Sequence, residues 1–113
     1  MKGIRKRIAK DAATARVPAH SEKHIQTQIL TWLRKLPACK PIKITGGMFM
    51  EAGISDIIAC VNGRYVAIEV KKPGGVVSAL QTRFIESVER AGGIGFVAYS
   101  LDEVKERLKD IVK

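Results

Sequence analysis

Cysteine is scarce in this 113-residue chain, and long hydrophobic runs are absent. Two cysteines, Cys39 and Cys60, are too few for a disulfide framework, and we expect Cys60 to be a small buried hydrophobic residue. No apolar run approaches the roughly 20 residues that span a bilayer, so no membrane partner is expected. The N-terminus lacks the apolar core of a signal peptide, which favours a cytoplasmic protein.

Metal-binding cysteine pairs are absent as well. On residue type alone, His20 and His24 could combine with the two cysteines into a zinc site. No C-x-x-C spacing accompanies them, so the sequence does not favour zinc.

Acidic residues are outnumbered by basic ones, 11 to 20, which gives a net charge of +9 and indicates a polyanionic partner. Residues 1–20 carry six basic residues and one acidic residue, whereas the remaining 93 residues carry 14 and 10. We predict that residues 1–20 form a basic N-terminal arm that grips phosphates, with a solubilising tail as the alternative. Residues 21–113 are predicted to form a single domain.

The most informative local pattern is a pair of apolar runs, 55–61 and 64–70, joined by Asn62-Gly63. Asn-Gly between two such runs is a strong signal for a β-hairpin. A two-residue turn sets the register so that facing residue numbers add up to 125, which places Asp56 opposite Glu69. Their Cβ atoms would then lie roughly 5 Å apart on one face of the sheet.

Two carboxylates held this close repel each other by about 3 kcal/mol at an effective dielectric near 20. Either a cation lies between them or one of them is protonated. An all-oxygen pair suits a hard divalent ion such as Mg²⁺ or Mn²⁺. Strand alternation places Lys71 on the same face, and a Lys71–Glu69 salt bridge is the alternative, although it leaves Asp56 unexplained.

Helical periodicity and capping residues define the other elements. The expected order is a helix over about 22–36, a strand at 42–45, the hairpin strands 55–61 and 64–70, a helix over 79–91, a strand over 94–99 and a helix over 101–112. The inward stripe of the second helix is expected to be Leu80, Phe84, Ile85, Val88 and Ala91. On the last helix, Glu103 and Arg107 are expected to pair at the surface. Because the hairpin is apolar on both faces, we predict an α/β fold with a mixed central β-sheet flanked by helices.

Two polar residues lie on the inward faces of these helices. Glu22 precedes Ile25 by three positions, although an acid in the first helical turn also interacts favourably with the helix dipole. Gln81 completes a capping box with Ser78 and could also face the carboxylate pair. Both interpretations stay open for each residue.

These residues together resemble the PD-(D/E)XK nuclease superfamily. More narrowly, the chain is similar to a stand-alone virus-type replication-repair nuclease (VRR-NUC) domain of the kind found in phages and bacteria. The resemblance covers about residues 21–100 and rests on a helix carrying an acid, Gly53-Ile54-Ser55-Asp56, Glu69-Val70-Lys71, and a helix opening near Ser78 and Gln81. Ser55 stands where the superfamily name has proline, a common departure. The resemblance implies a restriction-endonuclease-like α-β-β-β-α-β core.

The resemblance also implies a metal-dependent endodeoxyribonuclease that hydrolyses phosphodiester bonds with Mg²⁺ or Mn²⁺ and no organic cofactor. The matching catalytic positions are Glu22, Asp56, Glu69, Lys71 and Gln81. Asp56, Glu69 and the Val70 carbonyl would bind metal, and Glu22 would hold a second ion or orient a coordinated water. Lys71 would orient the nucleophile and steady the developing negative charge. Gln81 would position that water or the lysine.

Branched DNA is the expected substrate. Basic residues expected to contact it are Lys6, Arg7, Lys43, Lys72 and Arg83. We expect a homodimeric four-way (Holliday) junction resolvase, because two-fold symmetry supplies two nicks and stand-alone members of the family it resembles act on junctions as dimers. The loop Met48-Phe49-Met50 is the candidate interface, with capping of the local core as the alternative.

The functional alternatives are a flap- or duplex-cleaving, restriction-like endonuclease and an inactive DNA-binding module. The resemblance implies a location in the cytoplasm of a bacterium or a phage-infected host cell.

Overall fold

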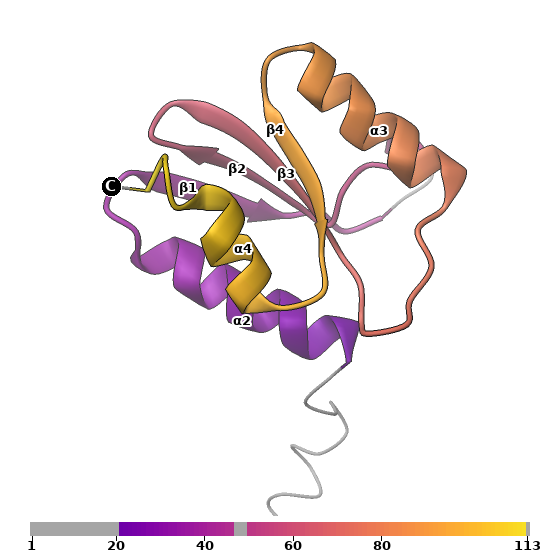
Figure 1. Ribbon diagram of the computed structural model, residues 1–113, viewed down its shortest axis with the longest axis horizontal. Helices are drawn as coiled ribbons and strands as arrows, with labels where there is room; N and C mark the ends of the chain where they lie inside the picture. Colours follow the sequence, from indigo (N-terminus) through magenta and orange to yellow (C-terminus); the bar gives the residue numbers. More distant parts are fainter. Residues whose placement is uncertain (1–20, 47–49, 113) are drawn as a thin grey trace, which may run out of the picture.

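The computed structural model describes residues 21–46 and 50–112 of the chain. In this part, a four-stranded mixed sheet has helices on both faces (Figure 1). The elements are, in order, α2 (Glu22–Lys35), β1 (Cys39–Lys43), β2 (Ile57–Val61), β3 (Arg64–Val70), α3 (Ala79–Arg90), β4 (Ile94–Ala98) and α4 (Leu101–Leu108). The strand order is β1-β2-β3-β4, with the first two pairs antiparallel and β3–β4 parallel. The predicted α/β fold and its order of elements are therefore confirmed.

Several sequence predictions fall outside the described residues. The basic arm over residues 1–20, with Lys6 and Arg7, lies there, as do Met48 and Phe49 of the candidate interface loop. The division between an arm and a domain starting at residue 21 stays a prediction. No helix in the part of the chain that the structure describes is long and apolar enough to cross a membrane.

The hairpin has the predicted turn and register. Asn62 and Gly63 both have positive φ angles, 49° and 81°, as a two-residue hairpin turn requires. Val61 faces Arg64 and Ile57 faces Ile68, so facing residue numbers add up to 125. The ladder begins at Ile57 rather than at residue 55, and Asp56 lies one residue ahead of it.

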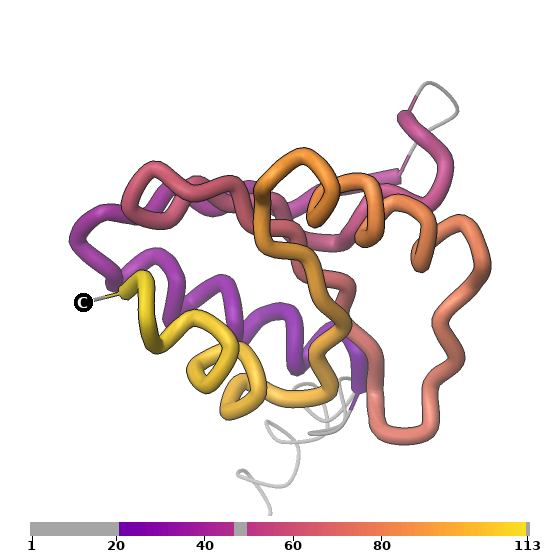
Figure 2. Tube along the Cα trace, turned by 45° about the horizontal axis from the view of Figure 1, so that its top comes forward, coloured from indigo at the N-terminus to yellow at the C-terminus, as the bar shows by residue number. Residues whose placement is uncertain are grey.

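The two faces of the sheet are covered unequally. Figures 1 and 2 show α2 and α4 side by side on one face and α3 on the other. The larger core lies under α2 and α4, where Ile29 and Ile68 are fully buried. On the opposite face, α3 contacts β3 and β4, and Phe84 packs with Ala67. β3 is therefore covered on both sides, which holds its carboxyl-terminal end firmly in place.

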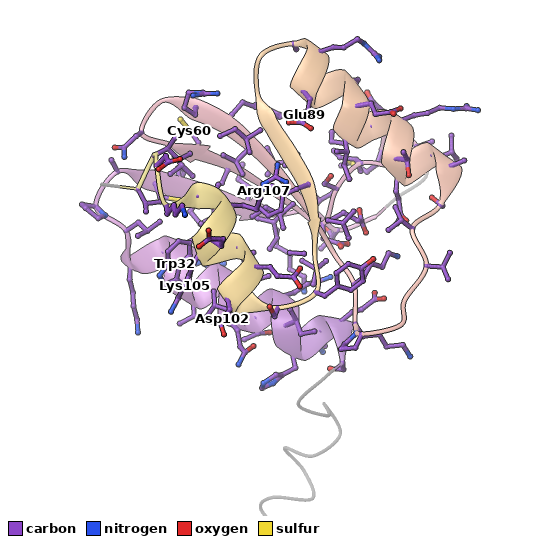
Figure 3. All side chains as sticks on the ribbon, viewed as in Figure 1. Trp32, Cys60, Glu89, Asp102, Lys105 and Arg107 are labelled. Atoms are coloured by element: carbon purple, nitrogen blue, oxygen red, sulfur yellow. The ribbon has the colours of Figure 1, made fainter. Side chains whose placement is uncertain are left out.

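Several predictions about burial and boundaries are wrong, among them the end of the last helix, which lies at Leu108 rather than at residue 112. Cys60 is exposed, because α3 covers β3 and β4 on that face rather than β2 (Figure 3). Leu80 and Ala91 are also exposed, because only the central turns of α3 face the core. β1 begins at Cys39, ahead of the expected residue 42, because it pairs along the full length of β2.

The expected Glu103–Arg107 pair is not formed. Glu103 Oε1 instead accepts the Tyr99 backbone N–H at 2.9 Å, which caps the start of α4. The Arg107 guanidinium lies 4.7 Å from the centroid of the Phe96 ring, an arrangement typical of cation–π contacts. Both side chains therefore stabilise the packing of α4 on β4.

Candidate active site

The carboxyl groups of Asp56 and Glu69 meet where β2 begins and β3 ends. Val70 N–H donates to Asp56 Oδ2 at 2.8 Å, which holds Asp56 against β3 although residue 56 lies ahead of the ladder. Glu69 is only 2% exposed. The juxtaposition expected from the hairpin register is present, and a backbone hydrogen bond maintains it.

The Glu69 carboxyl is strongly perturbed by this environment. Its pKa is raised from 4.5 to about 8, first by burial and then by the hydrogen bond and negative charge of Asp56. Lys71 opposes this shift, since its Nζ lies 3.8 Å from Glu69 Oε2, while the charge of Glu22 adds to it. Without a cation, the carboxyl pair therefore holds a proton at neutral pH.

Gln81 has both of the functions that the sequence left open. Its Oε1 accepts the Ser78 backbone N–H at 2.8 Å, and its own backbone N–H donates to Ser78 Oγ at 3.1 Å. Because the cap engages Oε1, the amide nitrogen faces Glu69, and Nε2 donates to Glu69 Oε2 at 3.1 Å. The capping box thus orients the amide toward the carboxyl pair.

Gly53 allows α3 to approach the loop before β2. Its φ is +77°, and a Cβ at this position would lie 2.3 Å from the Leu80 carbonyl oxygen and 2.9 Å from the Gln81 nitrogen. No side chain fits at such distances, so glycine is required for the first turn of α3 to lie here. Sequence reasoning included Gly53 in the motif without a physical role, and this contact supplies one.

Glu22 reaches the edge of the site from the start of α2. A Cβ on Gly75 would lie 3.5 Å from Glu22 Oε1 and 3.3 Å from the Lys71 Cβ, so the acid and the lysine both lie beside Gly75. Among the described residues, no three His, Cys, Asp or Glu side chains are grouped closely enough to hold a metal ion. Glu22 is therefore a neighbour of the Asp56–Glu69 pair rather than a member of a three-carboxylate cluster.

The carboxyl pair alone fits a divalent cation. Glu69 Oε1 is buried and receives no hydrogen bond from the residues that the structure describes. Leaving a buried acceptor unpaired costs about 1–3 kcal/mol, so a ligand or a proton is expected there. Mg²⁺ is commonly held by one or two carboxylates together with waters and substrate phosphates. A third carboxylate is thus not needed. The structure shows the Val70 N–H bonded to Asp56, while the Val70 carbonyl as a ligand stays a prediction.

Exposed basic residues lie near this site. Lys43 ends β1, and the next residue, Ile44, donates its N–H to the Asp56 carbonyl at 2.8 Å. Lys72 follows β3 directly after the candidate lysine, and Arg83 lies in the first half of α3. All three are exposed. Their contact with DNA stays a prediction.

Comparisons with known proteins agree with this geometry. The family model of the VRR-NUC domain matches residues 4–102. A solved structure described as a VRR_NUC domain protein has a TM-score of 0.66 and 21% identity, with 81% of this chain and 88% of that chain covered, which shows a shared fold. A search of the curated proteins finds no match. The family match includes every residue of the site from Glu22 to Gln81. The chain therefore belongs to the VRR-NUC family, and its domain is that of a nuclease, with DNA as the implied substrate.

Proposed function

We propose that this protein is a metal-dependent, structure-specific DNA endonuclease that cuts four-way junctions. The observation that carries the proposal is the buried Glu69 carboxyl: one oxygen receives no hydrogen bond from the described residues, and the other is held by Gln81 Nε2. Asp56 lies beside it and raises its pKa. This arrangement costs the fold free energy unless a cation or a proton compensates it.

The side chains divide the work of phosphodiester hydrolysis. A bound Mg²⁺ or Mn²⁺ would supply Lewis acidity and lower the pKa of a water ligand. Asp56 and Glu69 would hold the ion, with Asp56 aligned by the Val70 N–H. Lys71, 13% exposed and 3.8 Å from Glu69 Oε2, would interact with negative charge that develops on the phosphate.

Gln81 and Glu22 would support this arrangement. Gln81 would fix the Glu69 carboxylate, because its amide is itself held by the capping box. Glu22 would orient a water or hold a second ion from its place beside Gly75. Lys43, Lys72 and Arg83 would bind DNA phosphates.

Asp56→Asn tests the metal and the acid together. Asn keeps an oxygen that can accept the Val70 N–H but loses the charge. We expect cleavage of a labelled four-way junction to be lost while circular dichroism and thermal unfolding show an intact fold. Asp110→Asn, the same change at an exposed position after α4, should cleave like the wild type. Full activity in excess chelator, or in the Asp56 variant, would contradict the site assignment.

The junction preference and the homodimer need separate measurements. A junction requires two nicks, and a closed two-fold dimer supplies two sites without another domain. Of the candidate interface loop, Met50 is described and is 41% exposed. Duplex, flap, splayed-arm and four-way substrates should be compared with Mg²⁺ and with Mn²⁺, alongside sedimentation at micromolar concentration. A monomer that cuts flaps better than junctions would replace the resolvase by a flap nuclease.

A further inference from the structure

The sheet face that carries the carboxyl pair continues toward the hairpin turn as an exposed apolar surface. Pairing and side-chain alternation put its members on the same face as Asp56 and Glu69. We call it the Tyr65 surface, and its side chains are Lys40, Ile42, Ile58, Cys60 and Tyr65. With Ala59 they line a hollow of about 240 Å³.

This surface is unusually exposed for its chemistry. Ile42 is 53% exposed and Tyr65 is 49% exposed, and Cys60 is exposed between them on β2. Tyr65 also lines a second hollow of about 440 Å³ on its other side, where it faces Phe84 and Val88 of α3. The tyrosine ring therefore stands between two hollows. Exposed aromatic and apolar groups clustered in this way mark binding surfaces.

We propose that the Tyr65 surface binds an unstacked nucleobase of the DNA strand whose backbone reaches the carboxyl pair. This inference rests on the proposed function, because cleavage brings DNA to this face of the sheet. Tyr65 and Glu69 are four residues apart on β3, about 13 Å at roughly 3.3 Å per residue, which is a few nucleotides along a strand. Branched DNA offers unpaired or weakly stacked bases at its branch point.

The chemistry of the hollow matches a nucleobase. An aromatic ring offers stacking that is worth about 1–3 kcal/mol per base. Among the described residues, Lys40 is the charged one that lines the hollow and no acid lines it, which suits the phosphate that accompanies a base. The backbone of β1 and β2 closes the floor, and Ile42 and Ile58 supply apolar contact.

A second copy of the chain is the competing occupant. Six of the residues that the structure describes line the hollow, whereas a standard protein interface has about 20–30 residues on each side. A partner chain seated here would also lie on the face that the carboxyl pair needs for DNA. Both considerations favour the nucleobase.

The test compares Tyr65→Ala with Tyr65→Phe, each in the Asp56→Asn background so that DNA is not cut. The probes are a single-stranded dodecamer and a four-way junction that carries 2-aminopurine beside the branch. We expect Tyr65→Ala to weaken binding by roughly five- to a hundredfold and to abolish quenching of the 2-aminopurine by stacking. Tyr65→Phe, which keeps the ring, should retain both.

Val76→Ala serves as the control, because Val76 is 83% exposed and lies outside the Tyr65 surface. It should bind and quench like the Asp56→Asn parent. Unchanged quenching and affinity in Tyr65→Ala would overturn the proposal. The proposal would also be overturned if Tyr65→Ala sedimented as a monomer, the parent sedimented as a dimer, and quenching were the same in both. The Tyr65 surface would then be a subunit interface. If quenching depends on Tyr65 but the wild-type protein cleaves no DNA, the nuclease proposal is refuted and the nucleobase proposal is not.

Discussion

Replacing Glu69 by Gln should remove a pH dependence that this carboxyl imposes on the stability of the metal-free protein. The pKa of Glu69 is raised from 4.5 to about 8 in the folded state, because the carboxyl is buried and lies beside Asp56. Between these values the folded protein holds a proton that the unfolded chain releases. The stabilising contribution of this proton is therefore complete below about pH 4.5 and is lost as the pH rises through 8.

The size of the effect follows from this interval. At about 1.4 kcal/mol per pH unit, the loss from pH 4.5 to pH 8 can reach at most about 5 kcal/mol. The pKa of about 8 already includes the opposing charge of Lys71, 3.8 Å away, so we expect a loss of about 3–5 kcal/mol. Gln cannot ionise, and it keeps an oxygen that can accept the hydrogen bond from Gln81 Nε2.

Urea unfolding in chelator at pH 5, 7 and 9 measures this difference. Trp32, the single tryptophan, lies on α2 beside α4, is partly buried against the core and reports unfolding by its fluorescence (Figure 3). Titrating groups that do not contact Glu69 contribute equally to both proteins, so the difference between wild type and Glu69→Gln reports the Asp56–Glu69 pair. We expect the variant to gain stability relative to the wild type as the pH rises from 5 to 9.

Glu106→Gln is the matched control. Glu106 is 70% exposed on α4 and pairs with Lys109, so its removal should leave the wild-type pH profile unchanged. Parallel profiles for wild type and Glu69→Gln would mean that Glu69 is ionised throughout, which would refute the reasoning about its burial and its partner Asp56.

Three further outcomes are expected. Lys71→Ala should lower single-turnover cleavage by about a hundredfold or more and change DNA affinity much less, because its charge acts on the transition state; losses in proportion would make it only a phosphate contact. Gly53→Ala should lower the free energy of unfolding by more than about 2 kcal/mol, since its Cβ would lie 2.3 Å from the Leu80 oxygen, whereas Gly63→Ala carries only the strain of a positive φ; equal losses in urea unfolding would contradict the contact. Deleting residues 1–17 should weaken DNA binding and flatten its salt dependence without changing cleavage at saturating DNA; an unchanged salt slope would make the arm a passive tail.

The hairpin can be predicted from sequence because a local rule sets a long-range pairing. Asn62-Gly63 is compatible with only a few turn types, and the turn length then fixes which residues face each other down to Ile57 and Ile68. Asp56, one residue ahead of this ladder, thereby comes next to Glu69. The exposure of Cys60 cannot be predicted in the same way. Alternation shows that a strand face is apolar, but whether a helix extends over it depends on where α3 packs.

The contact between Gln81 and Glu69 depends both on a local sequence pattern and on the packing of α3. The capping box is local, and Ser78 with Gln81 three residues later predicts it. The hydrogen bond to Glu69 requires the start of α3 to lie close to β3. This close packing is possible because Gly53 has no side chain that would clash with Leu80 and Gln81. The periodicity of apolar residues does not give the distance between α3 and β3, so the sequence leaves the role of Gln81 open.

The capping box also restricts which residue can stand at position 81. Glu and Gln both complete a box with Ser78 and would start α3 equally well. Only Gln has a donor for Glu69 Oε2, while Glu would place a further negative charge against a carboxyl whose pKa is already raised by burial and by Asp56. Replacing the Gln81 amide by a carboxylate would thus leave the fold intact and shift the affinity of the carboxyl pair for protons and cations. Position 81 is consequently a point at which the acidity of this site can be adjusted independently of the stability of α3.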